Sequence, residues 1–143
     1  MQVVERSALV TFTPAQMFAL VNDIARYPEF LPWCVDAQVE ELSATERMAA
    51  VNVAKGPVRM RFATRNTVKA DSQILMQLAE GPFSHLEGRW NFDAVGERGS
   101  RVLFRVEFEF KSRLMSAALS PVFQSICDSI VDAFVRRAQG IYG

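Results

Sequence analysis

Polar and apolar residues alternate along most of the first 111 residues of the chain. A period of two predicts β-strands with one buried and one solvated face. Turn-forming residues, such as Gly56-Pro57 and Gly81-Pro82, separate the later alternating segments. Because no helical stretch interrupts these segments, they predict an antiparallel meander rather than parallel βαβ units. We expect seven strands, at residues 3–11, 35–43, 46–54, 58–69, 73–80, 86–95 and 101–111.

A short helix is expected between the first two strands. The segment from Thr13 to Gln16 has the pattern of a capping box, with proline in the first turn. Pro28 disfavours helical geometry in the residue before it, so we expect this helix to end near Arg26. At most one further turn fits between Pro28 and Pro32. The expected buried face consists of Met17, Phe18, Val21 and Ile24.

A long amphipathic helix is predicted over residues 113–139, where apolar residues occur in pairs every four positions. Four residues exceed one helical turn by about 40°, so the apolar stripe winds around the helix and suits a curved sheet. Pro121 predicts a kink or a restart after a short first turn, and Gly140 a stop. The pattern predicts one α+β domain, residues 1–143, in which a seven-stranded curved antiparallel sheet is closed by this helix.

One face of the predicted sheet is aromatic and the other is charged: Phe104 and Phe108 alternate with Arg105 and Glu107. Only the long helix is large enough to cover the aromatic face. The pattern alone leaves open whether these residues fill a core, the commoner outcome, or surround a ligand. The expected lining of such a cavity is Met60, Phe62, Leu78, Trp90, Phe92, Phe104, Phe108, Leu119, Phe123, Ile126, Ile130 and Phe134.

A cavity mouth is expected at one end of the sheet. Because a meander reverses at every turn, the Gly56-Pro57 and Gly81-Pro82 turns and the start of the long helix should lie at the same end. We place the aromatic, proline-containing segment 27–33 there as well. The expected mouth residues are Tyr27, Phe30, Leu31, Trp33, Gly56, Pro57, Gly81 and Pro82.

The charge composition argues against a strongly basic surface on this protein that would bind a nucleic acid. Lys plus Arg and Asp plus Glu both number 16, so we expect no DNA partner, and any basic site must be local. Five arginines on the charged strand faces could contact ribosomal RNA phosphates. We favour the alternative that they pair with carboxylates on a solvated face. These arginines are Arg59, Arg61, Arg65, Arg89 and Arg105.

Patterns for catalysis or metal binding are weak. The chain has one histidine and no His-Glu-x-x-His, Gly-x-Ser-x-Gly or phosphate-binding glycine loop. His85 follows a turn and is expected in a solvated loop, while Cys34 and Cys127 are expected to be buried, reduced thiols. We predict that the protein is not an enzyme and that it requires no cofactor or metal. A cyclase or dehydratase site inside the cavity is the alternative that the sequence leaves open. No secretion signal or membrane span is apparent, which predicts a cytoplasmic location with transient contact at the inner membrane.

The segment Tyr27 to Cys34, YPEFLPWC, resembles the signature of the coenzyme Q-binding branch of the START-like, polyketide cyclase-like superfamily. Similar matches follow in the family's order: GPF at 81–83, LEGRW at 86–90, FEF at 108–110, PVF at 121–123 and VDAF at 131–134. The resemblance implies a helix-grip fold. His85 departs from the family, in which a basic residue often stands at this position, and this departure puts neither fold nor cavity in doubt.

The resemblance implies two different functions. Mitochondrial members of the family bind ubiquinone and support respiration, which makes a carrier or chaperone for a polyprenyl quinone, or another apolar small molecule, our leading hypothesis. We expect ligand exchange at the membrane through the segment 27–33. A bacterial member is described as a toxin that blocks association of ribosomal subunits, so a regulator that binds the large subunit is the alternative. An enzyme acting on a cyclic or polyketide-like substrate comes third.

Overall fold

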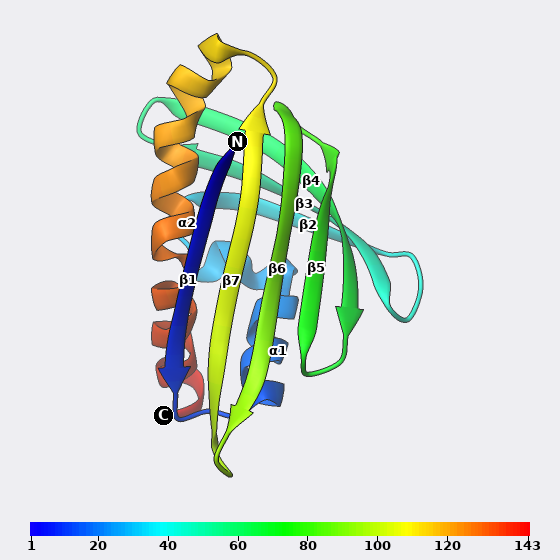
Figure 1. Ribbon diagram of the computed structural model, residues 1–143, viewed down its shortest axis with the longest axis vertical. Helices are drawn as coiled ribbons and strands as arrows, with labels where there is room; N and C mark the ends of the chain where they lie inside the picture. The colour runs from blue at the N-terminus through cyan, green and yellow to red at the C-terminus, as the bar shows by residue number, and fades with distance from the viewer.

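The strands form one seven-stranded antiparallel sheet in the order β1-β7-β6-β5-β4-β3-β2, described for residues 1–143 in a computed structural model. The sheet curves strongly, so that β2 to β4 run across the direction of β1, β6 and β7 (Figure 1). The elements are β1 (Gln2–Val10), α1 (Pro14–Asn22), η1 (Ile24–Glu29), β2 (Cys34–Glu41), β3 (Glu46–Lys55), β4 (Val58–Lys69), β5 (Gln73–Glu80), β6 (Phe83–Val95), β7 (Gly99–Phe110) and α2 (Arg113–Tyr142). The predicted fold class is confirmed, with strand bounds shifted by three residues at most.

The register confirms the predicted aromatic face. Trp90 of β6 lies opposite Phe104 of β7, and Leu86 lies opposite Phe108. These side chains are buried in one hydrophobic core between the sheet and α2. The concave face of the sheet is therefore the covered face.

The first helix is shorter than expected. The capping box forms, with Thr13 Oγ1 accepting from Gln16 N and Gln16 Oε1 accepting from Thr13 N. The helix ends at Asn22 rather than near Arg26, and the 3-10 helix η1 then runs through Pro28. The expectation that Pro28 would keep Tyr27 out of helical geometry was wrong. Tertiary contacts outweigh that local preference, because the Tyr27 hydroxyl donates to the Val21 carbonyl and its ring packs on Phe134.

Helix α2 runs without interruption through Pro121, and its first turns are inclined to the rest (Figure 1). It continues past the predicted stop at Gly140, because the Tyr142 hydroxyl donates to Gln16 O at 3.1 Å and its ring packs on Phe12. By length and composition alone α2 could cross a membrane. In the fold, however, one face of α2 is buried against the sheet. We therefore describe it as a core helix.

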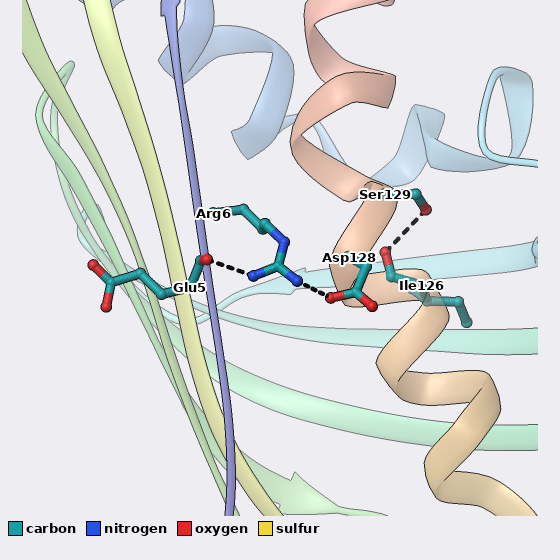
Figure 2. Close-up of polar contacts among 5 residues, drawn as sticks. All are labelled: Glu5, Arg6, Ile126, Asp128 and Ser129. Atoms are coloured by element: carbon teal, nitrogen blue, oxygen red, sulfur yellow. Dashed lines mark hydrogen bonds and ion pairs between the residues drawn. The ribbon is translucent and has the colours of Figure 1, made fainter.

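An ion pair links the edge strand β1 to helix α2. Figure 2 shows Arg6 reaching from β1 to Asp128 of α2, at 2.5 Å, while it also donates to Glu5 O at 2.7 Å. Within α2 the Ser129 hydroxyl donates to Ile126 O. Both side chains of this pair are exposed, so it contributes little to stability. An inward-pointing charge on an edge strand disfavours pairing with another chain, so Arg6 protects this edge.

Candidate ligand-binding cavity

An internal cavity of about 100 Å³ lies between the concave face of the sheet and α2. Of its 21 lining residues, 18 are hydrophobic, so the space suits apolar ligand atoms. The cavity exists because three successive inward residues of β3 are small. Ala49, Val51 and Val53 form one wall, and Gly88 contributes no side chain to another.

Six of the predicted cavity residues line this space: Phe62, Trp90, Phe104, Phe123, Ile126 and Ile130. The other six do not line it and instead pack around it: Met60, Leu78, Phe92, Phe108, Leu119 and Phe134. Phe108 and Phe134 are each 0% exposed because neighbouring aromatic rings surround them. The aromatic face is thus partly filled core and partly cavity wall.

One end of the cavity is closed by an aromatic cluster, which consists of Phe62, Phe83, Phe108, Phe110 and Phe123. Ring centroids in it lie as close as 4.6 Å, between Phe83 and Phe110. The Gly81-Pro82 turn sits directly on this cluster, since a Cβ at Gly81 would lie 2.8 Å from the Phe62 Cβ. Gly81 and Pro82 therefore border a filled region, and their assignment to a mouth was wrong.

The residues that we expected to form one cavity mouth lie in separate places, because the sheet is curved. The start of α2 lies beside the end of β7, whereas η1 packs against the C-terminal half of α2 (Figure 1). Tyr27 and Leu31 are buried and form a packed corner rather than an opening. Gly56 and Pro57 lie in an exposed hairpin turn that does not line the cavity. Connectivity placed these turns at one end, but the curved sheet separates them.

Trp33 separates the cavity from a groove on the surface. This outer groove, of about 570 Å³, runs between residues 30–33 and the C-terminal half of α2, and Trp33 is the only residue that lines both spaces. Phe30 lies in the groove, where the Arg137 guanidinium stacks 4.8 Å from its ring centroid. Of the predicted mouth, Phe30 and Trp33 therefore lie at the boundary between cavity and solvent.

Two polar residues in the cavity wall were missed by the sequence analysis. Thr64 and Asn66 occupy inward positions of β4 and line the cavity, and Thr64 Oγ1 donates to Asn66 Oδ1 at 2.7 Å. Asn66 is only 1% exposed. The signal was present, because both residues continue the alternation of Met60, Phe62 and Val68.

The titratable groups in the cavity wall hold their protons. Burial raises the pKa of the Tyr27 phenol and of the Cys127 thiol, both of which line the cavity. Burial also raises the pKa of Cys34 to about 11. As predicted, both cysteines are buried and free. A protonated thiol is a poor nucleophile, so none of these groups is activated for covalent chemistry.

His85 does not lie in a solvated loop as expected, because β6 begins at Phe83 and includes it. On the convex face His85, Glu87 and Glu107 bring three possible metal-ligand atoms within 4.8 Å of one another. The Arg105 guanidinium already pairs with one of them, donating to Glu107 at 3.0 Å and lowering the pKa of that carboxyl. A bound cation would compete with Arg105 for Glu107.

Most of the candidate RNA-contact arginines are engaged within the protein. Three form ion pairs: Arg61 with Glu80, Arg65 with Glu46, and Arg105 with Glu107. Arg59 donates to the Gly56 carbonyl of its own turn, and Arg89 has no ion-pair partner. Because β5 lies between β4 and β6, the arginines form two groups rather than a continuous stripe.

Residues 10–135 match the family model for polyketide cyclase/dehydrase and lipid transport proteins. The chain belongs to this family. It is 42% identical over 140 residues to the ribosome association toxin RatA of Pseudomonas aeruginosa, covering 98% of this chain and 97% of that protein. It is 33% identical over 141 residues to the mitochondrial coenzyme Q-binding protein COQ10 homolog B of Xenopus laevis, covering 96% of this chain and 58% of that protein. The resemblance drawn from sequence motifs is confirmed.

Solved structures share the fold. A START superfamily protein from Mycobacterium smegmatis superimposes with a TM-score of 0.81 at 16% identity, covering 97% of this chain and 98% of that one. The Zhui aromatase/cyclase from Streptomyces sp. R1128 superimposes with a TM-score of 0.80 at 13% identity, covering 96% and 93%. At these identities the likeness establishes a START-like fold, and that fold also serves enzymes.

Proposed function

We propose that the protein binds a hydrophobic small molecule in the cavity between the sheet and α2, and that this ligand is a polyprenyl quinone such as ubiquinone. The observation that carries the proposal is the apolar cavity, which borders the outer groove at Trp33. Burying hydrocarbon contributes about 0.8 kcal/mol per methylene, so two isoprene units offer roughly 8 kcal/mol before ordering costs. The similarity to the coenzyme Q-binding protein supports a quinone as the ligand.

The cavity must open for such a ligand. At about 100 Å³ it is smaller than the engineered cavity of about 150 Å³ that accepts benzene in another protein. A displaced Trp33 would connect it to the outer groove, where a prenyl tail can lie. The polar link beside Trp33 is the 3.0 Å ion pair between Glu29 and Arg137, and partly exposed pairs contribute little to stability. Opening at Trp33 would break this pair and leave the buried contact of Tyr27 with Phe134 in place.

We propose a cytoplasmic protein that exchanges ligand at the inner membrane. Lys55, Arg136 and Arg137 line the outer groove beside its apolar residues. Basic side chains attract anionic lipid headgroups while the groove accepts the tail. The outer groove is thus the side that would face the membrane.

We propose binding rather than catalysis. The Tyr27 hydroxyl donates to a backbone carbonyl, and the raised pKa values of Tyr27 and Cys127 keep both groups protonated. A nucleophile needs an adjacent base or a lowered pKa, and neither condition holds for these two residues. The proposed ligand needs no cofactor.

The direct test is organic extraction of protein made in its native type of cell, followed by mass spectrometry. We expect a polyprenyl quinone or another apolar lipid, and saturable binding of ubiquinone analogues by the stripped protein. Affinity should rise with tail length until the groove is filled. Trp33→Ala should speed ligand exchange, whereas Val35→Ala, at a neighbouring exposed position, should not. The proposal is disproved if the extracted protein carries no lipid and the stripped protein shows no saturable binding of the analogues.

A second candidate function is association with the ribosome, through the large subunit, so that subunit joining is blocked. The observation that favours it is the 42% identity to RatA over nearly the full length of both chains. The surface to test is the convex face, where Arg59, Arg61 and Arg65 lie on β4. Protein contacts with RNA phosphates weaken as salt is added.

Charge reversal at Arg59, Arg61 and Arg65 together should abolish co-sedimentation with ribosomes while the melting temperature changes little, since exposed charges contribute little to stability. Reversal at Arg101, an exposed arginine on β7, is the matched control. Retained, salt-insensitive co-sedimentation of the triple variant would exclude this surface.

A further inference from the structure

We propose that Asn66 and Arg47 form a hydrogen-bond-donor subsite at one end of the cavity, and that it binds a carbonyl oxygen of the ligand. The subsite deepens the proposed ligand-binding function and rests on it. It also gives the bound molecule a direction, with its ring at Asn66 and its tail toward Trp33.

Asn66 supplies a donor in the cavity wall. Its side chain lines the cavity and is 1% exposed, and its Oδ1 accepts from Thr64. This hydrogen bond uses the amide oxygen and leaves Nδ2 available to donate. A ligand oxygen can accept from Nδ2, or it can displace a water that does so.

Arg47 supplies a second donor beside the first. It lies directly opposite Asn66 in the pairing of β3 with β4, so both side chains are on the concave face. The Arg47 Nε is buried and has no hydrogen-bond partner. Arg47 does not itself line the cavity, so we propose that its guanidinium turns toward the ligand atom that Asn66 contacts.

The donors and Trp33 mark opposite ends of the space. The Trp33 carbonyl accepts from Ala54 N at 2.9 Å, whereas Arg47 lies seven residues earlier on β3. At about 3.3 Å per residue, the path along the strand is about 23 Å, and curvature of the sheet makes the direct distance shorter. A ligand that enters past Trp33 therefore reaches Asn66 with its leading end, and its tail remains near the outer groove.

The free groups at this site are both donors, so they select an oxygen acceptor. A quinone carbonyl fits, and the carboxylate of a fatty acid offers the same acceptor chemistry. A carboxylate would also pair with the Arg47 guanidinium. We assign the carbonyl because the proposed ligand is a quinone, and the fatty acid is the alternative that the test separates.

The test compares decylubiquinone with decylbenzene, which has the same tail and no oxygen, and with dodecanoic acid. For the wild type we expect the quinone to bind most tightly. Asn66→Leu should weaken quinone binding about 3- to 10-fold and leave decylbenzene unchanged, because one hydrogen bond is lost. Asn52→Leu, at an outward position of β3, is the matched control and should change neither affinity.

The outcomes separate the subsite from the function on which it rests. If the wild type binds neither decylubiquinone nor decylbenzene, the proposed function fails. If it binds both and Asn66→Leu leaves quinone affinity unchanged, only the subsite fails. Tighter binding of dodecanoic acid than of the quinone would overturn the carbonyl assignment.

A measurement on the wild type covers the case in which Asn66→Leu does not fold. In a ¹H–¹⁵N spectrum, the side-chain amide resonances of Asn66 should shift on addition of decylubiquinone and much less on addition of decylbenzene. Equal shifts with both ligands would overturn the subsite.

Discussion

The two ends of the space under α2 are packed in opposite ways. At one end, the aromatic cluster interlocks, with Phe108 and Phe123 at 4.7 Å between ring centroids. Toward β3, the wall consists of Ala49, Val51 and Val53, and a cavity remains. The same helix and the same sheet cover both ends.

The size of the inward side chains decides the difference. Strands β6 and β7 bring phenylalanines together at Phe83, Phe108 and Phe110, and offset or edge-to-face rings fill space efficiently. The inward residues Ala49, Val51 and Val53 of β3 are also apolar but smaller. A hydrophobic face can thus be a closed core along one strand and a ligand cavity along another.

Removing a ring from the aromatic cluster should have the largest effect on stability. Phe108→Ala should lower the free energy of unfolding by about 3–5 kcal/mol, because it leaves a void among fully buried rings. Urea denaturation measures this loss. Phe30→Ala, at a half-buried position in the outer groove, should cost clearly less. Equal losses would mean that the aromatic cluster is packed no more tightly than the outer groove.

Alkaline pH should act on the cavity side, where the buried acids lie. When a group has a higher pKa in the folded state than in the unfolded state, its contribution to stability is complete below the unfolded pKa. That contribution is lost as pH rises through the folded pKa. For Cys34 this window extends from about 9 to about 11, and ionisation of the thiol lowers the free energy of unfolding across it. Denaturation at pH 8 and pH 10.5 measures the loss. Cys34→Ala should reduce the pH dependence, and an unchanged pH dependence would contradict this assignment.

Filling the cavity should weaken ligand binding while changing the free energy of unfolding little. Ala49→Leu should change the free energy of unfolding by less than about 1 kcal/mol, because the added atoms enter empty space. It should weaken decylubiquinone binding at least tenfold in a titration. Ala50→Leu, the next residue on the outward face of β3, should leave binding intact. Undiminished binding by Ala49→Leu would place the ligand elsewhere.

The smallest effect is expected on the convex face. Arg61→Gln removes an exposed ion pair with Glu80 and should change the free energy of unfolding by less than about 0.5 kcal/mol. Thermal denaturation provides the measurement. A loss above 1 kcal/mol would show that this face is more than a solvated surface.

Much of the fold could be predicted because local patterns specify it. The strands predicted from the alternation and the capping box of Thr13 and Gln16 both formed as expected. The errors concern contacts between distant segments. Tyr27 stays in a 3-10 turn through its contacts with Val21 and Phe134, and His85 joins a strand that pairs with β7.

By itself the sequence determined the elements, the aromatic face and the family, because each depends on residue type at regular or short spacing. Only the tertiary structure decided where the cavity lies. Curvature of the sheet separates the turns that connectivity places together, and the unequal sizes of opposing side chains leave space beside β3. The pair Thr64 and Asn66 followed the strand period, yet only the fold showed that both face a cavity and that Asn66 lies opposite Arg47.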